Sequence, residues 1–107
     1  MTQKLLSPLV GMLDLKPHRE GGWYRELWKC AIEVPKDVLG SEYSGPRPSA
    51  TSIYFLLHPG ESSRWHTVLS EELWLYHSGS PLRITLGGDG DHPAAAQEYI
   101  LGPDLAA

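Results

Sequence analysis

Residues 59–81 contain two runs that predict β-strands, and these runs bring together basic, acidic and aromatic side chains. Gly60 and Gly79 predict turns at the two ends of the stretch. Side chains alternate between the two faces of a strand, so every second residue shares a face. The polar and aromatic side chains that share these faces are Arg64 and His66 on the first run and Glu72, Trp74 and Tyr76 on the second. We expect these side chains to converge on one concave site.

The rest of the chain predicts mostly short strands separated by turns. Eleven glycines and nine prolines interrupt the apolar runs, which leaves room for short elements only. Further strands are predicted at residues 23–30, 49–57, 82–86 and 97–101. Residues 34–49, which have no sustained period, predict a long loop. This pattern is typical of an all-β sandwich or barrel.

One short helix is predicted at the start of the chain, over about residues 7–16. Leucine, valine and methionine recur there at helical spacing. Ser7 is suited to the N-cap and Pro8 to the first helical position. Pro17 disfavours helical geometry in the residue before it, so the helix should end by Lys16.

Several sequence blocks follow one another in order along the chain. They are PHREGGWYRE at residues 17–26, TSIYFLL at 51–57, WH followed by EELWLYHSGSPL, and a late YILGPDL. Within them, glycine, histidine, glutamate and glycine are spaced as Gly60, His66, Glu72 and Gly79. This spacing resembles the first conserved cupin motif, and the blocks together resemble the cupin_5 family, also called DUF985, of the cupin superfamily. The resemblance implies one cupin domain over residues 1–107, a double-stranded β-helix or jelly roll. In it, the helix at about residues 7–16 precedes a strand region at 20–107.

The chain departs from the family pattern in three places. Arg19 stands where the family usually has proline. Val68 stands where metal-binding cupins have a second histidine, a loss that cupin_5 proteins generally share. The second cupin motif does not follow before Ala107. We therefore expect a jelly roll that is incomplete at its carboxyl end, either as a fragment of a longer product or covered by a partner chain, because unpaired strand edges promote aggregation.

The ligand positions argue against a bound metal. The metal sites of metal-binding cupins consist of three histidines and one glutamate. In this chain only His66 and Glu72 stand at such positions. Two protein ligands are fewer than a structural or catalytic zinc site uses. His77 should face away from Glu72, and His58 and His92 lie in or near predicted turns, where we expect them to be solvated. No cofactor is expected, and any residual metal would use His66 and Glu72.

Two functions remain open for the expected site. The first is metal-independent binding of a small molecule, such as a sugar, nucleotide or other metabolite. The side chains that would bind it are Arg64, His66, Glu72, Trp74 and Tyr76. The second is catalysis resembling that of cupin nucleotide-sugar epimerases, with His66 as general base, Glu72 orienting its ring and Tyr76 as acid. Arg64 would then hold an anionic substrate. Trp74 is also explained as plain core filling, and His66 as a residue that binds without catalysing.

Partners and location follow from the remaining features. The family resemblance implies a homodimer, for which Trp23 and Trp28 are the interface candidates, although both are equally explained as core residues. A structural dimerisation module without ligand is a further alternative. A net charge of −4 argues against nucleic-acid binding, and no apolar run reaches membrane-spanning length. The lone Cys30 and the lack of signal-peptide features at residues 1–11 fit a cytoplasmic protein.

Overall fold

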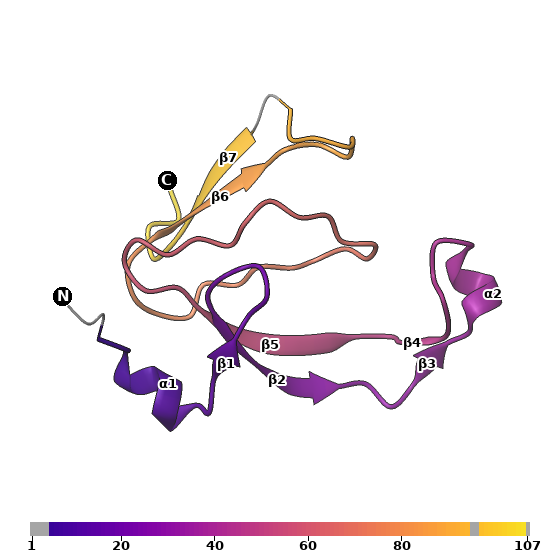
Figure 1. The fold of residues 1–107 in the computed structure, drawn as a ribbon, viewed down its shortest axis with the longest axis horizontal. Coiled ribbons are helices and arrows are strands. Elements are labelled where there is room, and N and C mark those ends of the chain that lie inside the picture. The colour runs from indigo at the N-terminus through magenta and orange to yellow at the C-terminus, as the bar shows by residue number, and fades with distance from the viewer. Residues whose placement is uncertain (1–4, 95–96, 107) are drawn as a thin grey trace. The chain divides into compact units, whose positions relative to one another are not determined.

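The computed structural model describes residues 5–94 and 97–106, and the chain divides into two compact units, Met1–His66 and Thr67–Ala107 (Figure 1). The helices are α1 (Pro8–Met12) and α2 (Lys36–Leu39). The strands are β1 (Lys16–Pro17), β2 (Trp23–Lys29), β3 (Glu33–Val34), β4 (Arg47–Pro48), β5 (Thr51–Leu56), β6 (Leu82–Leu86) and β7 (Gln97–Leu101). Strand outweighs helix among the described residues, which supports the all-β prediction. The complete jelly roll and the single domain stay predictions.

Helix α1 begins where its capping residues predict. The Ser7 Oγ accepts a hydrogen bond from the Leu9 N–H at 3.1 Å, and Pro8 occupies the first helical position, where its missing N–H costs nothing. The helix stops at Met12, which is within the limit that Pro17 sets at Lys16 but short of the predicted range of about residues 7–16. Asp14 adopts a φ of 53°, which turns the chain so that Leu15 becomes buried and β1 can begin. Pro17 fits β1 because a short edge strand does not need its N–H.

The first unit is built on an antiparallel sheet with the strand order β1-β2-β5. Figure 1 shows β2 and β5 running side by side along the length of this sheet. Their register pairs Trp23 with Leu56 and Lys29 with Thr51, and it shifts between Glu26 and Trp28. Such a β-bulge inserts one extra residue and reverses the alternation of faces beyond it.

The bulge brings two tryptophans to one face of the sheet. Strict alternation predicted Trp23 and Trp28 on opposite faces of β2. In the observed register, Trp23 pairs with Leu56 and Trp28 with Ser52, and these partners are an even number of residues apart on β5. The two tryptophans therefore lie on the same face, with Arg25 between them.

Each face of the sheet is contacted by a different segment of the first unit. On the tryptophan face, the Arg25 guanidinium donates to the Leu13 carbonyl at the end of α1, at 3.3 Å. On the other face, the edge of the His18 ring meets Tyr24 and Phe55, with ring centroids 5.1 and 5.4 Å apart. The turn at residues 18–22 thus packs against the Tyr24 face.

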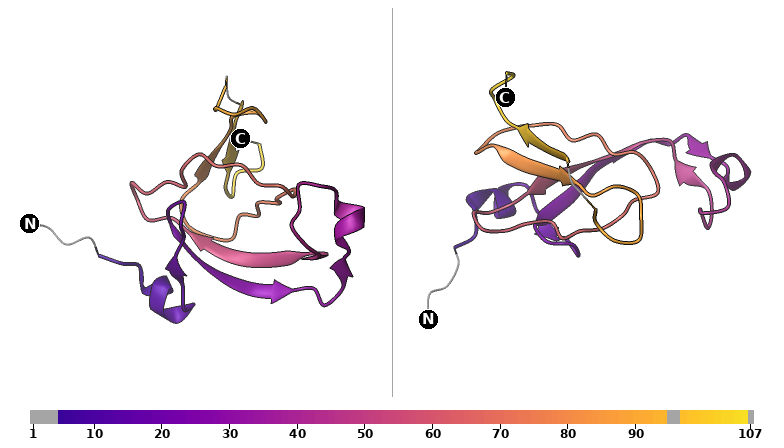
Figure 2. Two further views of the ribbon diagram at one scale, coloured as in Figure 1. Left: turned by 45° about the vertical axis from the view of Figure 1, so that its right-hand side comes forward. Right: turned by 90° about the horizontal axis from the view of Figure 1, so that it is seen from above.

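The predicted loop at residues 34–49 was only partly correct. Strands β3 and β4 pair antiparallel, with Glu33 opposite Pro48 and Val34 opposite Arg47. Between them lies α2, a single turn of helix that ends at Gly40 with a φ of 107°. Figure 2 shows this excursion beyond the end of β2 and β5. Proline and glycine end each of these elements quickly, which is why no period is visible in the sequence.

In the second unit, β6 and β7 form an antiparallel hairpin with the predicted bounds. Leu82 pairs with Leu101 and Leu86 with Gln97. Gly102 packs closely against Pro81. If Gly102 had a Cβ, that atom would lie only 3.1 Å from the Pro81 Cβ. The two strands predicted within residues 61–81 were wrong, since that stretch has turns and irregular backbone only. Alternating side chains do not by themselves provide the neighbouring backbone that a strand must pair with.

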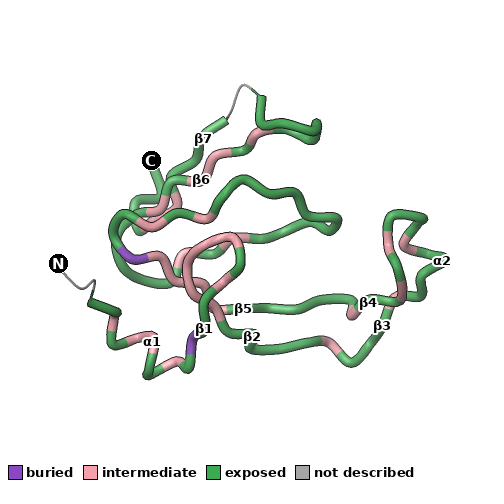
Figure 3. Tube along the Cα trace, in the orientation of Figure 1, coloured by how far each residue is buried: buried purple, intermediate pink, exposed green. Residues whose placement is uncertain are grey.

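Burial is sparse among the described residues. Leu15 is 5% exposed and His58 is 8% exposed, and Figure 3 colours these two positions as the buried ones. The sheet residues Trp23, Tyr24 and Phe55 are half-buried. In the part of the chain that is described, no helix has the length and apolar character that crossing a membrane requires.

Candidate functional site

A hydrogen bond at the His66 ring defines which of its two nitrogens carries the hydrogen. The Nδ1 atom lies 2.6 Å from the Arg64 carbonyl oxygen. A carbonyl oxygen only accepts, so Nδ1 must carry the hydrogen. In the neutral ring, the lone pair is then on Nε2, which can accept a hydrogen bond or a proton. His66 as a residue is exposed.

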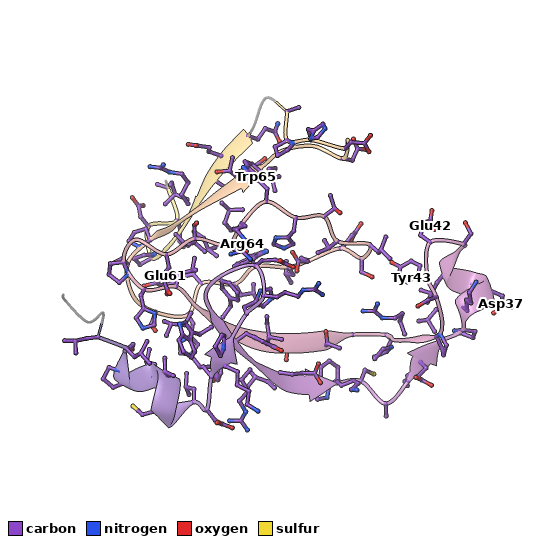
Figure 4. All side chains as sticks on the ribbon, in the orientation of Figure 1. Asp37, Glu42, Tyr43, Glu61, Arg64 and Trp65 are labelled. Carbon is purple, nitrogen blue, oxygen red and sulfur yellow. The ribbon has the colours of Figure 1, made fainter. Side chains whose placement is uncertain are left out.

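Arg64 is itself held by the turn that packs on the Tyr24 face of the sheet. Its backbone N–H donates to the Glu20 carbonyl at 2.6 Å, and its guanidinium donates to the Arg19 carbonyl. Figure 4 labels Arg64 beside this turn. A guanidinium has five donors in a planar fork, more than one carbonyl uses, and the Arg64 side chain is exposed. The predicted anion contact at Arg64 is therefore compatible with its position.

The other three predicted site residues lie in the second unit. Trp74 and Tyr76 are half-buried, whereas their neighbours Leu73 and Leu75 are 84% and 77% exposed. The predicted alternation of side chains is thus visible here without a strand. The Tyr76 hydroxyl donates to the Gly79 carbonyl at 2.8 Å. Glu72 is exposed. The convergence of these residues with Arg64 and His66 on one pocket stays a prediction.

His58 was wrongly predicted to be solvated. Its Nε2 accepts from the Ser7 N–H at 2.8 Å, and its Nδ1 donates to Glu61 Oε1 at 2.7 Å. Trp23 meets the ring edge-on, with centroids 6.4 Å apart. The signal in the sequence is the acid three residues after the histidine, across a Pro-Gly turn that brings the two side chains together. This group ties the start of α1 to the end of the β5 segment, which is a structural role.

The interface candidates differ in exposure. Trp23 is half-buried against His58, as expected for a core residue. Trp28 is 53% exposed, so within a single chain it is not a core residue. Their common face on β2 makes them available to one surface. A partner at this surface stays a prediction.

The donor set does not fit the metal site of metal-binding cupins. Val68, at the position of their second histidine, has no donor atom. Over residues 5–94 and 97–106, no group of three or more His, Cys, Asp or Glu side chains is arranged to hold a metal ion.

The chain matches the model of a known protein family. The family model Cupin_5, described as the cupin superfamily (DUF985), matches residues 7–107. This confirms the family predicted from the sequence blocks. Neither the curated proteins nor the solved structures include a match to the chain.

Proposed function

Because the chain belongs to the Cupin_5 family of the cupin superfamily, we propose that it binds a small polar molecule at His66 without a metal. The molecule is of the sugar, nucleotide or metabolite class. The observation that carries the proposal is the hydrogen bond from His66 Nδ1 to the Arg64 carbonyl, which leaves the acceptor at Nε2 of an exposed residue. A hydroxyl group of the ligand would donate to this nitrogen.

The other predicted site residues have complementary roles in the proposal. Arg64 binds an anionic group of the ligand, because a guanidinium forms paired, charge-assisted hydrogen bonds with carboxylates and phosphates. Trp74 and Tyr76 provide aromatic faces for a ring or sugar, and Glu72 accepts from further hydroxyl groups.

The lone Cys30, which has no partner cysteine in the chain, is consistent with a cytoplasmic location.

A second candidate function is proton transfer by an epimerase- or isomerase-like enzyme, and the bond between His66 Nδ1 and the Arg64 carbonyl supports it. An imidazole whose Nδ1–H is fixed by a carbonyl presents Nε2 as the basic atom. His66 would take a proton from the substrate and Tyr76 would return one. This needs the Tyr76 hydroxyl to exchange its bond with the Gly79 carbonyl for one with the substrate.

We also propose a homodimer that uses the tryptophan face of β2. The support is the bulge, which places Trp23 and Trp28 on one face, and the 53% exposure of Trp28. Exposed aromatics are enriched at interfaces. A structural module without ligand would share this dimer and would show no saturable binding at His66.

Native mass spectrometry of the purified chain, with metal analysis of the same sample, tests the proposal. We expect an organic molecule to co-purify with the wild type and with the control His92→Ala, but not with His66→Ala. His92 is an exposed histidine outside the predicted site. One equivalent of a transition metal that disappears in His66→Ala would overturn the metal-free proposal. Solvent deuterium that enters the molecule only when His66 is present would select the enzyme over the binding protein.

A further inference from the structure

The turn at residues 18–22 is closed by its own backbone and then holds a second segment. The His18 N–H donates to the Gly22 carbonyl at 2.8 Å, and the Gly21 N–H donates to the His18 carbonyl at 3.1 Å. The carbonyls of Arg19 and Glu20 remain on the outside and accept from Arg64. The turn therefore fixes both the backbone and the guanidinium of Arg64.

Gly21 makes this close approach possible. Its φ is 112°, a conformation that side chains with a Cβ rarely adopt. A Cβ at this position would lie 2.2 Å from the Ser62 carbonyl oxygen, which is far inside contact distance. Because that atom belongs to the backbone, it cannot rotate away as a flexible side chain would. A residue with a Cβ here must therefore shift the turn or the Ser62 backbone, and this disturbs the contact between the turn and residues 62–64.

We propose that this turn sets the tautomer of His66. By holding Arg64, it directs the Arg64 carbonyl at Nδ1 and keeps the hydrogen on that nitrogen in the neutral ring. Gly21 and Arg64 are thus positioning residues for the Nε2 lone pair. The chain of contacts runs from Gly21 to Ser62, from Glu20 to Arg64, and from Arg64 to His66. All of these residues belong to the unit Met1–His66.

The consequence for binding rests on the proposed function, but the tautomer does not. If the hydrogen moved to Nε2, that atom would offer a donor where the ligand needs an acceptor. A variant that loses the turn should then lose the ligand while it retains His66. A protein that binds nothing at His66 would still show the tautomer described here, so failure of the proposed function would leave this proposal standing.

Nitrogen-15 NMR of the imidazole rings in the full chain tests the proposal at a pH where His66 is neutral. His66 is assigned as the signal that is missing in His66→Ala. In the wild type we expect a protonated Nδ1 and an unprotonated Nε2. In Gly21→Ala the ratio of Nδ1–H to Nε2–H should fall by about three- to tenfold, the effect of one hydrogen bond.

Gly40→Ala is the matched control, because Gly40 has a φ of 107° and its Cβ would meet only the flexible end of Glu42, at 3.0 Å. It should keep the wild-type tautomer. Arg64→Gln provides a second variant should Gly21→Ala not fold, and it should also lower the Nδ1–H fraction, with recovery in Arg64→Lys. A wild-type His66 with its hydrogen on Nε2, or an unchanged ratio in folded Gly21→Ala or Arg64→Gln, would overturn the proposal.

Discussion

His58 and Glu61 are joined by two hydrogen bonds to a single carboxylate oxygen. Glu61 Oε1 accepts from the His58 ring Nδ1 and from the His58 backbone N–H, each at 2.7 Å. The turn between them is closed by the Glu61 N–H, which donates to the His58 carbonyl at 2.9 Å. The side chains are only 7% and 21% exposed, so water replaces these bonds poorly.

Glu61→Ala should therefore destabilise the chain. The substitution leaves two donors of a buried histidine without their acceptor, and we expect the free energy of unfolding to fall by about 1–3 kcal/mol. Chemical denaturation measures this change. The control Glu71→Ala removes an exposed carboxylate and should change the free energy by less than about 0.5 kcal/mol. Equal effects of the two substitutions would mean that the pair at His58 contributes nothing.

Two of the features that were predicted correctly depend on residues near in sequence. The start of α1 follows from Ser7 and Pro8, which act on the first turn directly. Strands β6 and β7 follow from alternation on either side of a glycine-rich turn. In each case the partner that stabilises the element is near in sequence.

The features that were missed depend on distant partners. The bulge in β2 is defined by its pairing with β5, and the letters around Leu27 continue to alternate through it. The ring of the buried His58 accepts a hydrogen bond from the Ser7 N–H, which is 51 residues away. Residues 61–66 alternate as a strand would, but the Arg64 N–H bonds to the Glu20 carbonyl in a turn instead. The hydrogen bond between the His66 ring and the Arg64 carbonyl is local. The residue types alone, however, do not show whether the His66 ring bonds to Arg64 or to Glu72.

Gly22→Ala and Gly11→Ala should have opposite effects on stability. A Cβ at Gly22 would lie 2.8 Å from Phe55 Cζ and 2.9 Å from Leu57 Cδ2, and its φ is 80°. The clash and the strained backbone should cost about 2–4 kcal/mol. A Cβ at Gly11 meets nothing within 4 Å, and alanine favours the helix, so we expect a gain of about 0.5–1 kcal/mol. Thermal and denaturant unfolding check both signs, and a loss in Gly11→Ala would contradict the open space there.

The thiol of Cys30 should react faster than an ordinary thiol at neutral pH. Hydrogen bonds from the Ser49 hydroxyl, first, and from the Ile32 backbone lower the pKa of Cys30. A lowered pKa favours the folded state above the pKa of the unfolded thiol, and this contribution is lost as the pH falls through the folded value. The rate of alkylation by iodoacetamide against pH should thus have its midpoint below that of the unfolded chain.

Ser49→Ala tests the cause of this shift. Without the hydroxyl donor, the midpoint of the alkylation profile should move to higher pH, because the thiolate loses its main stabilising bond. Ser41→Ala, which removes an exposed hydroxyl elsewhere in the first unit, should leave the profile unchanged. If the two variants gave the same midpoint, the Ser49 hydroxyl would not act on Cys30.

Trp28→Ala should weaken the proposed homodimer. Trp28 is 53% exposed and lies on the same face of β2 as Trp23, so a second copy would cover it. Truncating a tryptophan at the centre of an interface costs about 2 kcal/mol or more, which corresponds to roughly a 30-fold rise in the dissociation constant. Analytical ultracentrifugation over a range of concentrations measures that constant. Trp65→Ala is the matched control, since Trp65 is 58% exposed but lies outside the sheet, and it should dimerise as the wild type does. A monomeric wild type, or equal weakening by both substitutions, would contradict an interface on the tryptophan face.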